Sequence, residues 1–233
     1  MPPEDTGATG VVAGLRGESA GFETKSYEGH YEGTALLAAL ETRRFRANAV
    51  LPAYRIVRNG LAAEGLGDVL LQGGVVVLRS SEPRRTLGVD LGVSLPTGEV
   101  ESDLGMGHVM VMPSLWGAWR AHPLTIMASA GYGRAMTALG SGHHDHGLAP
   151  LVDPMNLQEL TWSASADLDV GHGVQVGGRT LGGVPIGTGH LRAIGGGRVA
   201  WGTPRITTAF ELQLGIAGDP FTIRGVAETS LHF

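Results

Sequence analysis

The chain contains no cysteine, few charged residues and no long apolar run. With no Cys among its 233 residues, neither a disulfide framework nor a thiolate metal site can form. No stretch reaches the length of about 18 apolar residues that a transmembrane helix requires. Charged residues make up only 17% of the chain, and the net charge of −5 is not accompanied by any Lys/Arg run. We therefore expect no transmembrane helix and no nucleic acid partner.

The sequence also gives little support for a helical protein or for an enzyme. Gly accounts for 38 of 233 residues, and each Gly costs a helix about 1 kcal/mol relative to Ala. A closed barrel tolerates this load, because small residues let its wall bend and pack. Gly-rich segments such as Gly195-Gly196-Gly197 lack the Lys-Ser/Thr pair of a phosphate loop. We therefore expect no enzyme, no nucleotide and no nucleophile elbow, with a hydrolase site assembled from distant strands as the alternative.

Residues 221–233 have one apolar and one polar face. Every second residue from Phe221 to Phe233 belongs to a mostly apolar set, whereas the residues between them, including Arg224 and Glu228, are mostly polar. This alternation suits a strand with lipid on one side and a lumen on the other, although a soluble edge strand is the alternative. The terminal Phe after alternate apolar residues resembles the C-terminal signal of bacterial outer-membrane proteins. That resemblance implies membrane lipid and the barrel-assembly machinery as partners, and the bacterial outer membrane as the location.

Segments of alternating hydrophobicity recur along the chain. Each is a little longer than the about 9 to 11 residues that cross a bilayer at a tilt. Twelve are predicted, at residues 9–22, 27–41, 44–57, 66–79, 85–96, 107–120, 123–137, 158–170, 173–184, 189–201, 204–216 and 221–233. Gly dilutes the period in the first, second and ninth segments, so ten strands is the alternative count.

The joins between these segments alternate in length. Tight joins such as 42–43 and 202–203 alternate with longer ones such as 97–106 and 138–157, although two expected long joins are short. Outer-membrane barrels alternate short periplasmic turns with longer extracellular loops in this way. The sequence therefore predicts an all-β fold: one antiparallel transmembrane β-barrel domain over residues 1–233, with a soluble β-sandwich as the alternative. Outward aromatic belts near strand ends are expected from Tyr132, Trp162, Trp201 and Phe233.

Two short motifs accompany the terminal aromatic strand. Gly65-Leu66-Gly67-Asp68 opens one predicted strand, and Leu95-Pro96-Thr97-Gly98 closes the next. Taken alone, both are turn chemistry at strand ends. Together with the C-terminus they resemble a bacterial outer-membrane family named for the meta-pathway of phenol degradation and described as outer-membrane transporters. The resemblance covers about residues 45–135 plus the C-terminal strand, and it implies a small barrel with poorly defined cargo and no catalytic residues.

Along the predicted strands, charged residues occupy the positions that alternate with the apolar ones, and we expect these charged residues to face a lumen. These candidate pore-lining residues are Arg120, Asp167, Asp169, Arg179, Arg192, Arg198, Arg205, Glu211, Arg224 and Glu228. Within this set, Arg192, Arg198, Arg205 and Arg224 predict a positive stripe on late strands that would favour anionic solutes. We therefore expect a passive channel or transporter for small solutes. The alternative is that the charges pair across the lumen and close it.

Two further groups consist of transition-metal ligand types. The predicted long loop carries His143, His144, Asp145 and His146, whose imidazole and carboxylate groups suit Zn, Cu(II) or Ni. Met106, His108, Met110 and Met112 share one face of a predicted strand and offer softer ligands. The alternatives are a solvated loop tip and Met packing beneath a loop. No resident cofactor is expected, and a plugged barrel that captures Cu or Zn or serves a structural role is the alternative function.

Overall fold

The computed structural model describes residues 10–23, 28–81, 84–102, 104–136, 158–186, 191–218 and 221–233. Within these ranges the chain forms antiparallel strands, and no helix there is long and apolar enough to cross a membrane. The strands are β1 (Gly10–Glu23), β2 (Glu28–Glu41), β3 (Phe45–Arg58), β4 (Leu61–Leu66), β5 (Val69–Ser81), β6 (Arg84–Leu95), β7 (Met110–Ala121), β8 (Leu124–Ala135), β9 (Gln158–Gly171), β10 (Val174–Pro185), β11 (Arg192–Gly202), β12 (Ile206–Ala217) and β13 (Phe221–His232).

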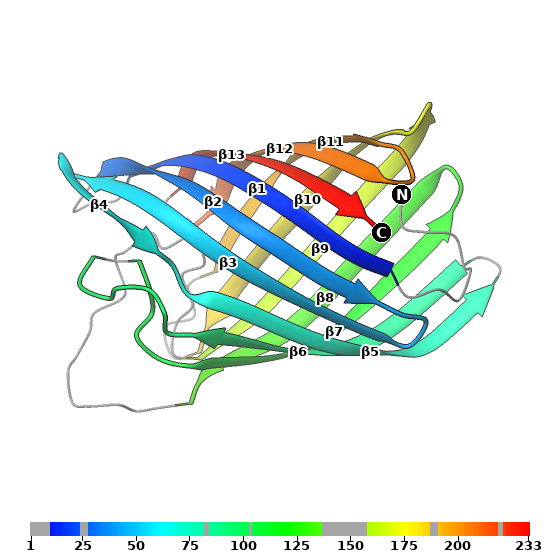
Figure 1. Ribbon diagram of the computed structural model, residues 1–233, viewed down its shortest axis with the longest axis horizontal. Helices are drawn as coiled ribbons and strands as arrows, with labels where there is room; N and C mark the ends of the chain where they lie inside the picture. Colours follow the sequence, from blue (N-terminus) through cyan, green and yellow to red (C-terminus); the bar gives the residue numbers. More distant parts are fainter. Residues whose placement is uncertain are drawn as a thin grey trace.

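The sheet closes on itself. Sequence neighbours pair along the chain, β1 pairs with β13, and β2 pairs with β3, so the order β2-β1-β13 through β5-β3 forms a ring. Figure 1 shows the resulting barrel of tilted strands. Each wall strand is paired on both sides, and closure of this kind is what a membrane-spanning sheet requires. The predicted antiparallel barrel of about twelve strands is confirmed, and the predicted bounds of its wall strands agree with the observed ones within about three residues.

One strand, β4, was not predicted. β3 turns at Asn59-Gly60, whose φ values are 49° and 82°, and returns as β4, which pairs with the outer half of β3. Positive φ at both positions is typical of the two-residue Asn-Gly hairpin turn, a signal present in the sequence but assigned to a loop. β5 continues after β4 and pairs with the other half of β3. The β3–β4 hairpin consequently projects from one end of the barrel (Figure 1).

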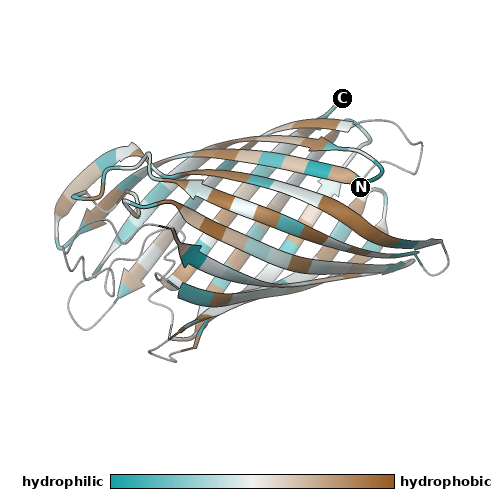
Figure 2. Cartoon of the chain, turned by 90° about the horizontal axis from the view of Figure 1, so that it is seen from below, coloured by the Kyte–Doolittle hydropathy of each residue, from teal (hydrophilic) through white to brown (hydrophobic). Residues whose placement is uncertain are grey.

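The two faces of the wall differ in polarity. Large apolar side chains such as Leu15, Leu91 and Phe210 are exposed on the outside, and apolar positions alternate with polar ones along the strands (Figure 2). Because every second residue of a strand faces the same way, the sequence period sets this division directly. An apolar exterior on a closed barrel matches contact with lipid.

The two ends of the barrel also differ. At the terminal end, the start of β1 lies beside the end of β13 through the pair Val12↔His232, and the turns are short. At the loop end lie the longer joins, including 96–109 between β6 and β7. Outward aromatic side chains occur near both ends, with Trp201 and Phe233 at the terminal end and Trp162 near the loop end.

Candidate functional site

The interior of the barrel wall carries a belt of ion pairs. Guanidinium groups and carboxylates from neighbouring or nearby strands face each other there, with N–O distances from 2.5 to 4.0 Å where the contacts are of ordinary length. The pairs include Arg16–Glu228, Arg46–Asp90, Arg179–Glu211, Arg192–Glu159, Arg198–Asp167 and Arg224–Glu18. Neutral pairs of this kind stabilise the wall against the low-dielectric membrane. They also cancel most of the charge that a solute would meet.

The most enclosed network surrounds Asp90 on β6. Its carboxylate accepts hydrogen bonds from Arg46 Nε at 2.9 Å, from Gln72 Nε2 at 2.6 Å and from Trp116 Nε1 at 3.0 Å. The Arg46 guanidinium also lies 3.9 Å from the centre of the Trp116 ring. Gly74 and Gly88 leave the room that this cluster needs, since a Cβ on either residue would lie within 2.5 Å of Asp90 or Trp116. Four adjacent strands are thereby joined through one buried carboxylate.

Replacing Asp90 by Ala is expected to lower the unfolding free energy by about 3 to 5 kcal/mol, because it leaves the Arg46 charge enclosed without its partner. Asp167→Ala is the matched control. Its pair with Arg198 is longer, at 3.4 Å, and more exposed, so a loss of about 1 kcal/mol or less is expected. Urea unfolding of the protein in lipid vesicles, followed by Trp fluorescence, measures both losses. Equal losses in the two variants would contradict the central role of Asp90.

The predicted pore-lining residues other than Arg120 fall into three groups. Arg179, Arg192, Arg198 and Arg224, with Asp167, Glu211 and Glu228, belong to the ion pairs of the inner wall. Asp169 lies near the β9–β10 turn, where its Oδ1 accepts a hydrogen bond from the Gly171 amide at 2.9 Å. Arg205 lies outside β12 in the β11–β12 turn and is exposed, so the expected strand position of this residue is wrong. Of the four arginines expected to form a positive stripe, three are therefore paired with carboxylates, and the fourth, Arg205, lies at the rim.

Arg120 belongs to a different positive group, at the terminal end. Arg84 on β6 lies directly opposite Arg120 on β7, and Arg79 on β5 lies opposite Thr86, on the same face. Glu41 at the end of β2 is the carboxylate that interacts with Arg120 electrostatically. Three arginines on three adjacent strands thus lie on the same inner face at this mouth of the lumen.

At the loop end the interior contains a group of buried apolar side chains. A cluster of buried side chains, termed here the apolar cluster, consists of Ala20, Phe22, Tyr31, Ile56, Leu104, Ile194 and Phe221. Tyr31 is fully buried, and its ring centre lies 5.6 Å from that of Phe221 and 6.3 Å from that of Tyr54. A wall residue that faces a water-filled lumen stays partly exposed. Complete burial of Tyr31 therefore shows that side chains fill the interior around it.

The apolar cluster reaches far around the ring. Tyr54 on β3 and Leu181 on β10 both pack against it. In the strand order β3-β2-β1-β13-β12-β11-β10, these two strands are six positions apart, and six positions separate them in the other direction as well. The cluster is thus in contact with diametrically opposite parts of the wall, and it narrows the lumen near the loop end.

The side chain of Phe221 faces the interior, and not the lipid as expected from the sequence. It was placed on the lipid face with Ile223, but the β1–β13 pairing is irregular between Gly21 and Phe22. One extra residue on β13 at this point pairs Phe221 with Phe22, and both rings turn into the apolar cluster. A β-bulge reverses the facing of every residue beyond it, so strict alternation cannot place this side chain.

The two motifs behind the family resemblance meet at the loop end. Asp68 of the first motif accepts hydrogen bonds from the amide of Gly98 at 2.9 Å and from that of Met106 at 2.7 Å. Thr97 of the second donates its hydroxyl to the Gly67 carbonyl at 2.8 Å and accepts from the Val69 amide at 3.0 Å. They fasten the β6–β7 join so that Leu104 enters the apolar cluster. Their function is thus more specific than turn formation alone.

The expected metal ligands are only partly described. His143, His144, Asp145 and His146 lie outside the described residues. Met106 and His108 precede β7, which begins at Met110, so the expected four-residue strand face is wrong in its first half. Met106, His108 and Met110 are buried and Met112 is half-buried. The described residues contain no group of three or more His, Cys, Asp or Glu that could hold a metal ion.

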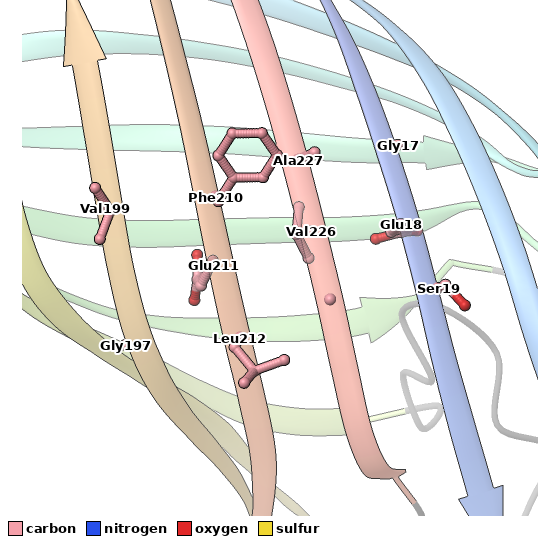
Figure 3. Close-up of a pocket in the computed structure, with 11 residues that line it drawn as sticks. Gly17, Glu18, Ser19, Gly197, Val199, Phe210, Glu211, Leu212, Val226 and Ala227 are labelled. Carbon is pink, nitrogen blue, oxygen red and sulfur yellow. The ribbon is translucent and has the colours of Figure 1, made fainter.

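The sequence Gly17-Glu18-Ser19-Ala20-Gly21 matches the Gly-x-Ser-x-Gly pattern, contrary to the expectation from the sequence. A nucleophile elbow places its Ser on a sharp turn between a strand and a helix, but this segment runs straight through β1. Ser19 instead borders a shallow outer groove of about 670 Å³ over β1, β13, β12 and β11 (Figure 3). The groove is lined mainly by Gly and apolar residues such as Phe210 and Leu212. The pattern therefore carries no hydrolase geometry.

Comparison with known proteins relates the chain to others by fold. No family model matches the sequence, and no curated protein matches it. An outer membrane channel from Pseudomonas putida F1 is similar in structure, with a TM-score of 0.78, 12% identity and coverage of 100% of both chains. The KdgM porin gives a TM-score of 0.60 at 8% identity, covering 95% of this chain and 99% of the porin.

A third similar structure comes from an autotransporter. The translocator domain of the autotransporter NalP from Neisseria meningitidis gives a TM-score of 0.56 at 12% identity, and the match covers 99% of this chain and 90% of the domain. The three proteins share an architecture with this chain at identities too low to transfer an activity. The chain therefore has the fold of bacterial outer-membrane barrels.

Proposed function

We propose that the protein is a passive outer-membrane channel for small solutes. The single observation that carries this proposal is the closed barrel with a lipid-compatible exterior and a charged, paired interior. Similar structures include an outer membrane channel and a porin, which supports the same class. Solutes would cross down their own gradient, without covalent chemistry or nucleotide.

The location and orientation belong to the same proposal. The terminal end, with its short turns, would face the periplasm, and the loop end would face the outside, as in other barrels of this class. Recognition by the barrel-assembly machinery belongs to the proposal, and the apolar outer face of β13 supports it. Membrane lipid would surround the outer wall.

The interior supports a narrow and selective passage. The apolar cluster restricts the loop end, while the ion pairs leave the middle of the lumen with little net charge. Arg79, Arg84 and Arg120 then place a group of positive side chains at the terminal end. We propose that any anion preference arises from these three residues, since the expected late-strand arginines are neutralised by carboxylates or lie on the rim.

Planar-bilayer conductance tests the channel and its preference together. The wild type is expected to conduct, and its reversal potential across a KCl gradient should indicate anion preference. The variant Arg84→Gln/Arg120→Gln should move the reversal potential toward cation preference, because it removes two positive groups from one mouth. Arg205→Gln is the matched control at the same rim and should leave the potential unchanged. Absence of current at every voltage would contradict the channel and favour a structural barrel.

A further inference from the structure

Among the described residues, four ion pairs of the inner wall join strands that are not neighbours. In each, a guanidinium group reaches a carboxylate two strands away, over an intervening strand that supplies neither group. The pairs are Arg46–Asp90 across β5, Arg179–Glu211 across β11, and Arg192–Glu159 and Arg198–Asp167 across β10. A side chain that crosses a strand needs space on the inner face of that strand. The residue at the crossing point therefore decides whether the pair can lie against the wall.

The residue at each crossing point is glycine. The residues aligned in the register with the four arginines are Gly74, Gly177, Gly183 and Gly196. Glycine makes up 38 of the 233 residues, so its presence at all four points exceeds its share of the chain. A Cβ on the first three would overlap a carboxylate oxygen of the crossing pair, whereas one on Gly196 would overlap the Leu212 backbone. We term Gly74, Gly177 and Gly183 the saddle glycines.

Glycines on the outer face of the same strands are not constrained in this way. Among the described residues, a Cβ on Gly197 of β11 would have no heavy atom within 4 Å. A Cβ on Gly178 of β10 would meet the Gly196 carbonyl oxygen at 3.4 Å, which is a van der Waals contact. The need for glycine is thus specific to the inner positions. It comes from the side chains that cross them, because a strand interior otherwise favours residues with a side chain to pack.

Gly183 is the saddle glycine beside the apolar cluster. The three atoms nearest to a Cβ on this residue all belong to the Glu159 side chain. Glu159 is 1% exposed, and its Oε1 accepts a hydrogen bond from Arg192 at 2.5 Å. Leu181 packs against the apolar cluster, and Ile194, with which it pairs, belongs to the cluster. An ion pair lifted from the wall at this level would project into the lumen where the apolar cluster already narrows it.

We infer that the saddle glycines set the width of the lumen. An ion pair that crosses over glycine lies against the wall with its two charges in contact. With a Cβ at the crossing point, the carboxylate must move off the wall, where it separates from the guanidinium group and occupies space that a solute needs. Gly74, Gly177 and Gly183 thus determine the size of solute that passes. The effect on solutes rests on the proposed channel, whereas the contact between glycine and ion pair does not.

A double-mutant cycle tests the contact without any current. Glu159→Gln and Arg192→Gln are made singly and together, in the wild type and in Gly183→Ala, and urea unfolding in lipid vesicles is measured. The coupling should change the unfolding equilibrium constant by about tenfold in the wild type and by about twofold or less in Gly183→Ala. Gly178→Ala is the matched control on the outer face of the same strand and should keep the full coupling. Full coupling in Gly183→Ala, or an equal loss in Gly178→Ala, would overturn the inference.

A second background keeps the test decisive if Gly183→Ala does not fold. In Glu159→Ala/Arg192→Ala the crossing pair is gone, so the addition of Gly183→Ala should no longer lower the stability. Failure of this triple variant to fold, or a further loss of stability when Gly183→Ala is added, would place the constraint in the backbone and overturn the inference.

Planar-bilayer recordings test the width. Single-channel conductance should fall by about twofold in Gly183→Ala, stay at the wild-type level in Gly178→Ala, and recover in Glu159→Ala/Gly183→Ala/Arg192→Ala. Wild-type conductance in Gly183→Ala, with the coupling lost, would overturn the assigned width. Absence of current in the wild type would contradict the channel itself, and the coupling would still decide whether glycine holds the ion pair.

Discussion

Replacement of both Tyr31 and Phe221 by Ala is expected to raise single-channel conductance several-fold. The two rings lie 5.6 Å apart at the centre of the apolar cluster, and both are almost completely buried. Removing them opens a cavity where the lumen is narrowed and lets water enter, which lowers the barrier to ions. Each large-to-small change also costs about 3 to 5 kcal/mol of stability. Planar-bilayer recordings measure the conductance, and urea unfolding measures the stability.

The control for this variant lies on the other face of the wall. Phe210 is 51% exposed on the outside of β12, so Phe210→Ala should leave the conductance unchanged. Tyr31→Leu keeps an apolar side chain in the cluster and should give an intermediate conductance if the double variant folds poorly. Wild-type conductance in both Tyr31 variants would show that solutes do not pass through the apolar cluster.

Replacement of Asp68 by Ala is expected to release the join between β6 and β7. Asp68 accepts two backbone hydrogen bonds from this join, at Gly98 and Met106, and no apolar side chain can replace them. Leu104 would then leave the apolar cluster, and the conductance should rise and fluctuate. Buried backbone amides left without acceptors also destabilise the fold by about 1 to 3 kcal/mol each.

Limited proteolysis detects the same release without any current. Glu99 and Glu101 lie in the join, so a Glu-specific protease should cut Asp68→Ala several-fold faster than the wild type. Ser102→Ala is the matched control, because its hydroxyl donates a hydrogen bond to the Glu99 carboxylate, at 2.6 Å, and not to the backbone of the join among the described residues. Protection of Asp68→Ala at the wild-type level would mean that Thr97 and the packing of Leu104 suffice to hold the join.

Much of the fold was predictable because a membrane barrel obeys a local rule. Each wall residue faces either lipid or lumen, so alternation along the chain reports the side directly. This rule located all twelve wall strands, and it placed Arg198 and Glu211 on the inner face. The Asn59-Gly60 turn was also a local signal, and reading it as a hairpin would have predicted β4.

The sequence by itself determined the barrel, its polar interior and the side chains available there. Only the tertiary structure decided which of them meet: that Arg198 is neutralised by Asp167, that Phe221 turns inward at a bulge, and that Asp68 holds the join carrying Leu104. The reason is physical. The side of the wall that a residue faces depends on whether its position in the strand is odd or even. Side-chain pairs, β-bulges and joins that fold inward depend instead on the register between strands that lie far apart in the chain, and the alternation within one strand carries no information about that register.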